Sequence, residues 1–234
     1  MPRPSRSASA SAPVRSSGRI LLWLCLAAAA LAFAKQEAPP LPKAFHAKTY
    51  PAVDAHDDER VAIAADPFDM ADKAAFMAVP YKQNDILPVR VIISNDSGAP
   101  LNLSQMQVQL TTVNPRAKVT PAEVDDLFRR LARQTRRGDE PSRNPLPIPL
   151  PGRKLKPAVK KEWQDEIESL RFKWLVVEPH STVSGFYFFD VRDLDHPLAG
   201  GHLYFTAVRD ESGQELLFFD IPLEKYLSYR PSAP

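Results

Sequence analysis

The stretch that decides the fold is Gln105-Met-Gln-Val-Gln-Leu-Thr-Thr-Val113, near the middle of the chain. From Gln105 to Thr112, polar side chains alternate with a second set that is mostly apolar. A period of two residues is that of a β-strand, in which successive side chains point to opposite faces of the sheet. The stretch therefore predicts a strand with one buried face and one face in water, which is typical of antiparallel sheets.

Similar patterns on both sides of this strand predict a mainly β protein. Further strands are expected at residues 60–65, 86–94, 172–177, 183–191, 202–208 and 215–221. The last two form a hairpin around Asp210-Glu-Ser-Gly213, and Asn95-Asp-Ser-Gly98 supplies another turn. About seven short strands separated by turns predict an antiparallel β-sandwich.

The period changes to that of a helix in the middle of the chain. Thr120-Pro-Ala-Glu123 has a capping threonine, a proline at the first helical position and a glutamate three residues after the cap. Apolar residues at helical spacing then predict a helix to about residue 134 and a second helix over 157–170. The sequence thus predicts a two-helix insertion, residues 116–171, in the β-sandwich.

Two segments carry a resemblance to a known group of proteins. They are Asn95-Asp-Ser-Gly98, after an apolar strand, and Glu178-Pro-His-Ser-Thr-Val-Ser-Gly-Phe-Tyr-Phe-Phe-Asp190. The second combines a proline, a polar pair, a glycine and an aromatic strand, and a hairpin follows it. It resembles the immunoglobulin-like β-sandwich domains of bacterial exported proteins of unknown function, over most of residues 58–227. This resemblance implies a fold and no chemistry, because one fold carries many functions.

The N-terminus has the features of a secretory signal peptide. Four arginines and no acidic residue precede an apolar run from Ile20 to Ala34, which ends in Ala32-Phe33-Ala34. Fifteen residues of helix rise about 22 Å, which is short of the ~30 Å hydrocarbon core of a bilayer. We therefore expect cleavage after Ala34 and a periplasmic or secreted protein, with an inner-membrane anchor formed by residues 20–34 as the alternative. Cys25 follows a leucine and not a small residue, so we do not expect a lipoprotein.

The expected organisation is a signal peptide or anchor over residues 1–34, a Pro/Ala-rich tether over 35–57, a domain over 58–227 and a disordered tail over 228–234. The only cysteine lies in the first segment. After cleavage the protein would have no disulfide, no thiolate metal site and no cysteine nucleophile.

Two sets of residues have side chains that could bind a metal or take part in catalysis. In His56-Asp-Asp-Glu59, only His56 with Asp58, or Asp57 with Glu59, can converge on an extended chain, so a solvated acidic turn is the expected structure. The second set would be a Ser–His–Asp triad, without any nucleophile-elbow motif. Its members are His180, His196, His202, Asp193, Asp195 and Ser181. The sequence thus predicts no catalytic, cofactor or metal site.

Charge is distributed unevenly along the chain. Residues 116–161 contain thirteen Lys and Arg against five Asp and Glu, whereas the rest of the chain after Ala34 has thirteen against twenty-three. One hypothesis is that the insertion contacts an envelope protein, an anionic polymer or a membrane surface, and not nucleic acid. The alternative is that it docks on the acidic β-sandwich. The candidate contact residues are Arg129, Arg130, Arg133, Arg136, Arg137, Arg153, Lys154 and Lys156.

These observations favour a non-enzymatic, extracytoplasmic binding or structural module of the bacterial cell envelope. The alternative is an exported hydrolase with an unrecognised site. Convergence of His56, Asp58, His180 or His196 around a pocket would favour the enzyme, and their dispersal would favour the module.

Overall fold

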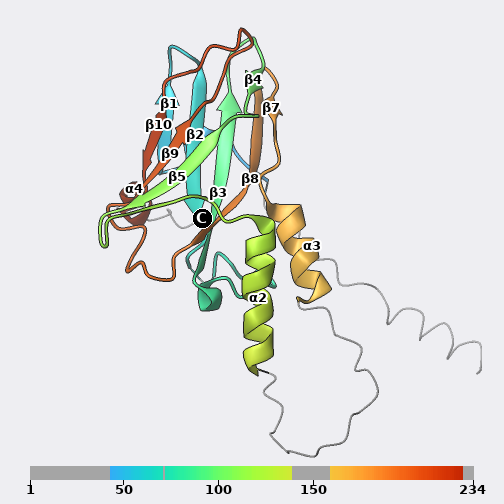
Figure 1. Ribbon diagram of the computed structural model, residues 1–234. Helices are drawn as coiled ribbons and strands as arrows, with labels where there is room; N and C mark the ends of the chain where they lie inside the picture. Colours follow the sequence, from blue (N-terminus) through green and yellow to red (C-terminus); the bar gives the residue numbers. More distant parts are fainter. Residues whose placement is uncertain (1–42, 71, 139–158, 229–234) are drawn as a thin grey trace, which may run out of the picture. The chain divides into compact units, whose positions relative to one another are not determined.

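A computed structural model describes residues 43–70, 72–138 and 159–228 (Figure 1). The strands in these ranges are β1 Val53–His56, β2 Val61–Pro67, β3 Ile86–Asn95, β4 Leu101–Asn102, β5 Gln107–Thr112, β6 Ala117–Val119, β7 Val176–Val177, β8 Ser181–Asp190, β9 His202–Thr206 and β10 Phe219–Pro222. The helices are η1 Ala47–Thr49, η2 Lys82–Asn84, α2 Val124–Gly138, α3 Lys161–Leu170 and α4 Glu224–Ser228. No helix in the described part is long and apolar enough to cross a membrane.

The strands form antiparallel sheets. The first sheet has the order β1-β2-β3-β8 and the second sheet has the order β10-β9-β5-β6, while β4 and β7 form a separate pair. Together with the two helices α2 and α3, which lie between β6 and β7 in the chain, this confirms the predicted mainly β class (Figure 1). The strands predicted at residues 60–65, 86–94, 105–113 and 183–191 correspond to β2, β3, β5 and β8.

Strand β3 is the centre of the structure, because all ten of its residues are buried. It pairs with β2 on one side and with β8 on the other. Its side chains at Leu87, Val89, Val91 and Ile93 share one apolar core with residues of the second sheet. The residues from the second sheet are Val108, Leu110, Leu203, Phe205, Phe219 and Ile221. The two sheets therefore pack face to face over this core.

The opposite face of the first sheet is also covered. Helices α2 and α3 contribute Leu131 and Ile167 to an apolar cluster with Ile86 and Phe186. Further along β3, Ile92 packs against Ala47. The sequence of β3 is consequently a nearly continuous apolar run, as expected for a strand with two buried faces.

The segment before the first predicted strand differs from the expected tether. Residues 43–57 contain η1 and β1, and β1 pairs in register with β2 from Val53↔Ala64 to His56↔Val61. Ala47 is fully buried and its N–H donates to the Ser94 hydroxyl at 2.9 Å. Small side chains let this segment lie close to the first sheet, which composition alone did not indicate.

Two other predicted elements have different bounds from those expected. Of the strand predicted at residues 172–177, only β7 forms, because Phe172 instead donates its N–H to the Phe186 carbonyl at 2.9 Å. This approach is so close that a Cβ on Gly185 would lie 2.5 Å from the Phe172 Cα. Helix α2 begins at Val124, since the preceding Ala122 N–H donates to the Phe188 carbonyl of β8. Helix α4 was not predicted.

The strand register predicts that the same substitution has a large effect on stability at one residue of β5 and a small effect at its neighbour. Val108 is 6% exposed in the shared core, whereas Gln107 points outward and is exposed. Val108→Asp should lower the free energy of unfolding by several kcal/mol out of a total of about 5–15, because it buries an unpaired carboxylate. Gln107→Asp should change it by no more than about 0.5 kcal/mol. Urea unfolding of both variants checks this, and equal effects would contradict the register.

Candidate functional site

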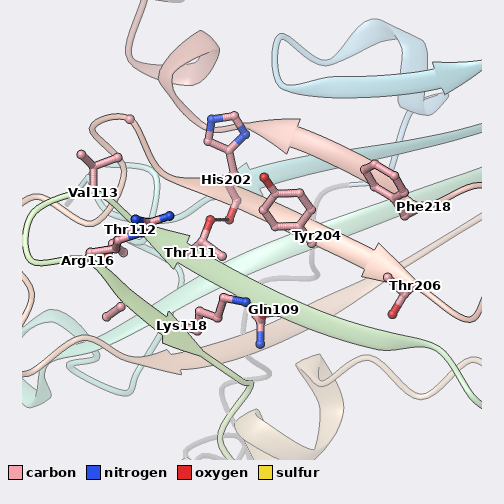
Figure 2. A pocket seen from close by; sticks show the side chains of 12 residues that line it. Gln109, Thr111, Thr112, Val113, Arg116, Lys118, His202, Tyr204, Thr206 and Phe218 are labelled. Carbon is pink, nitrogen blue, oxygen red and sulfur yellow. Dashed lines mark hydrogen bonds between the residues drawn. The ribbon is translucent and has the colours of Figure 1, made fainter.

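The outward face of the second sheet carries a groove of about 480 Å³ (Figure 2). Strand alternation places it there. Val108 and Leu110 of β5 point into the shared core, so Gln109 and Thr111, which alternate with them, point outward into the groove. On the neighbouring β9, the same alternation turns His202, Tyr204 and Thr206 outward. The groove therefore lies over β5 and β9, the two middle strands of this sheet.

Two cations line the side of the groove formed by β6. Lys118 lies opposite Thr111 in the β5–β6 ladder, and Arg116 ends the preceding turn. The Thr112 hydroxyl donates to the Pro115 carbonyl at 2.7 Å within that turn. Within the described ranges, neither cation forms an ion pair, and no carboxylate lines the groove. The groove is therefore electropositive.

Three rings line the other side. The ring centroids of His202 and Tyr204 are 6.0 Å apart, and those of Tyr204 and Phe218 are 6.4 Å apart. Figure 2 shows the three rings in a row, with Lys118 and Gln109 on the neighbouring strands. Phe218 is 58% exposed. A row of three rings with an exposed Phe218 is unusual on the outward face of a sheet, because large apolar groups are normally buried.

Asp220 of β10 positions two of these rings. Its carboxylate lies 2.7 Å from the His202 Nδ1. Burial and then the charge and hydrogen bond of Asp220 raise the pKa of the Tyr204 phenol above its ordinary value. The Asp220 N–H in turn donates to the Asp54 carboxylate of β1 at 2.8 Å. The ring row is thus anchored to the first sheet.

The residues around His56 connect the edges of the two sheets. The His56 imidazole lies 2.8 Å from the Glu59 carboxylate and 3.5 Å from that of Asp54, and its ring stacks on Phe219 with centroids 4.0 Å apart. Glu59 also accepts the Leu217 N–H at 3.1 Å. Side chains of β1 and of the turn after it therefore hold β10.

This arrangement differs from both pairings considered for a metal. His56 contacts Asp54 and Glu59, not Asp58, and Asp57 pairs with Lys48 at 2.8 Å. In residues 43–70, 72–138 and 159–228, no group of three or more His, Cys, Asp or Glu could hold a metal ion.

The residues considered for a triad do not meet. His180 lies in the turn before β8 and His196 in the loop after it, and a ten-residue strand separates its ends by roughly 30 Å. Ser181 donates its hydroxyl to the Glu178 carbonyl at 2.7 Å. His202 pairs with Asp220, and not with Asp193 or Asp195. Within the described residues, these side chains therefore do not form one site.

The arginines of the insertion have different environments. Arg130 is 14% exposed and lies 2.6 Å from the Asp190 carboxylate and 3.4 Å from that of Asp85. Arg129 is 70% exposed and pairs with Asp126 of its own helix. The side chains of Arg133, Arg136 and Arg137 lie outside the described residues, as do Arg153, Lys154 and Lys156.

The groove was not predicted from the sequence. Arg116 and Lys118 were counted with the helical insertion, although they belong to the turn before β6 and to β6 itself. The feature that could have indicated the site is the polar face of the strand at residues 105–113, which carries amide and hydroxyl side chains.

No protein-family model, no curated protein and no solved structure matches the chain.

The ion pairs of Arg130 lead to a prediction about stability. Arg130→Gln should lower the free energy of unfolding by about 1–2 kcal/mol at neutral pH, because Asp85 and Asp190 lose a charged hydrogen-bond donor. Arg129→Gln is the matched control and should cost less than about 0.5 kcal/mol, since exposed helical pairs contribute little. Chemical unfolding of both variants measures the difference.

This difference should depend on pH. Burial opposes ionisation of Asp190, but hydrogen bonds from Arg130 and from the Arg192 N–H lower the pKa of Asp190 overall. Its contribution to stability is present above the unfolded-state pKa of about 3.9 and is lost as pH falls through the lower folded-state pKa. A constant difference down to acid pH would contradict the assigned pairing.

Proposed function

We propose that this protein is a non-enzymatic, extracytoplasmic binding module of the bacterial cell envelope, and that it binds an anionic ligand in the groove. The location is supported by the basic flank, the apolar run and the Ala32-Phe33-Ala34 end of the N-terminal segment. Cleavage after Ala34 would leave a periplasmic or secreted protein, and retention would leave it anchored in the inner membrane. The module is proposed to be an immunoglobulin-like β-sandwich, in accord with two antiparallel sheets that share one core.

The observation that carries this proposal is the pair of exposed cations, Arg116 and Lys118. Neither forms an ion pair within the described part of the chain, so neither contributes to folding through one. Two like charges in neighbouring positions repel each other, and an anion in the groove would relieve that repulsion. Both cations belong to residues 116–161, which carry a net positive charge, whereas the rest of the chain after Ala34 is net acidic.

Of the candidate contacts in the insertion, only Arg129 and Arg130 have described side chains, and both form ion pairs. Arg130 already pairs with two carboxylates of the β-sheet region, Asp85 and Asp190, as expected if the insertion docks on its own domain. Arg129 is likewise paired. We therefore place the anion contact in the groove.

One observation favours a second function, an exported hydrolase. The His202–Asp220 pair at the groove has the geometry of a histidine oriented by a carboxylate, as in general acid–base catalysis. Within the described residues, however, that imidazole makes no hydrogen bond with a serine or threonine hydroxyl. Release of soluble fragments from an envelope polymer by the parent protein, absent for His202→Ala, would favour the hydrolase.

The binding proposal is tested with poly-L-glutamate, an anionic chain without rings. Binding should weaken as salt rises, because exposed charges are screened over about 10 Å at 0.1 M ionic strength. The double variant Arg116→Gln/Lys118→Gln should bind about tenfold or more weakly. The matched control, Arg129→Gln/Lys161→Gln, removes the same charge from the helices and should bind as the parent does. Loss of binding only in the control would move the site to the helices, and no binding by the parent at low salt would contradict the proposal.

A further inference from the structure

The groove has three parallel strips of different chemistry. Arg116 and Lys118 form a cationic strip along β6, and Gln109 and Thr111 form a hydrogen-bonding strip on β5. The third strip is the ring row along β9 and just before β10, which consists of His202, Tyr204 and Phe218. Adjacent strands lie about 4.8 Å apart, so the cations and the rings are separated by roughly 10 Å. A ligand that uses all three strips must be wider than one small ring.

From these strips we infer that the ligand is an acidic polysaccharide, an inference that rests on the proposed function of the groove. The C–H faces of sugar rings are apolar and slightly positive, and they complement the negative faces of aromatic rings. Sugar hydroxyls both donate and accept hydrogen bonds, as do the amide of Gln109 and the hydroxyls of Thr111 and Thr206. Carboxylate or phosphate groups on the polymer pair with the cationic strip. The 10 Å separation requires at least two linked sugars.

A peptide fits this site less well. Extended peptides add to the free edge of a sheet, but β5 is paired on both sides, with β6 and with β9. A helical peptide needs an apolar groove, whereas Val113 and Phe218 are the only large apolar side chains among the described residues that line this one. Polar groups and rings predominate.

Nucleic acid shares some of the required chemistry, since bases stack on aromatic rings and phosphates pair with cations. Single-stranded nucleic acids are held by a basic groove that follows the backbone over several nucleotides. In this groove the two cations lie together on one side and none lies beside the rings. The arrangement favours separated acidic groups on a sugar polymer over a continuous phosphate backbone.

The test compares four probes on the purified protein: polygalacturonate, its uncharged methyl ester, poly-L-glutamate and an oligo-dT strand. Polygalacturonate should bind at least about tenfold more tightly than poly-L-glutamate of similar length and charge, because only the sugar polymer uses the rings. The methyl ester should bind more weakly than polygalacturonate, since it cannot pair with Arg116 and Lys118.

The rings are tested with Tyr204→Ala/Phe218→Ala, which should abolish the preference for polygalacturonate over poly-L-glutamate. Leu217→Ala is the matched control, because Leu217 is 68% exposed beside Phe218 and does not line the groove. Phe218→Ala alone serves if the double variant unfolds, and it should reduce the preference.

The outcomes separate this inference from the proposed function. Equal binding of polygalacturonate and poly-L-glutamate, with no effect of the ring variants, would overturn the polysaccharide and leave anion binding in place. Tighter binding of oligo-dT than of polygalacturonate would overturn it in favour of nucleic acid. Failure of every anionic probe to bind would overturn both.

Discussion

The structure depends on the burial of β3 on both faces. One set of its side chains, including Val91, packs on the second sheet, and the other set is covered by residues 43–53 and by helices α2 and α3. Two polar side chains of β3 on the covered side have partners: Ser94 accepts the Ala47 N–H, and Arg90, only 3% exposed, donates to the Ser184 hydroxyl at 3.1 Å. Since buried polar groups without partners are costly, these contacts fix how the covering segments lie.

The same constraint leaves the second sheet with one face that no helix or strand of the described residues covers. Its inner face is occupied by the shared core, and its edge strand β10 is held by side chains from the first sheet, with Phe219 stacked on His56. The N–H groups of Leu217 and Asp220 are satisfied by Glu59 and Asp54. The backbone on either side of Phe218 is thus fixed, so the ring row is presented on a rigid support. A site built on strands in this way needs little ordering when a ligand binds.

The sequence predicted the parts that depend on local pattern. Alternation at Val108 and Leu110 predicted β5 and its buried face, and helical spacing predicted α2 and α3. It could not predict the groove, because that site requires Lys118 to pair opposite Thr111 and Gln109 to pair opposite Tyr204, which lies ninety-five positions later. The charge distribution of the sequence showed that the insertion is basic. It could not show that Arg130 forms ion pairs and that Arg116 forms none with the described residues, since that difference depends on tertiary contacts.

The central claim is that the free face of the second sheet is the binding surface. It is tested most directly by amide chemical-shift mapping of the isotope-labelled protein during titration with polygalacturonate. The account predicts shifts that saturate together at residues 109–118 of β5 and β6 and at residues 202–206 of β9, while α2 and α3 stay unchanged. Saturating shifts confined to the helices, with β5, β6 and β9 unaffected, would contradict it.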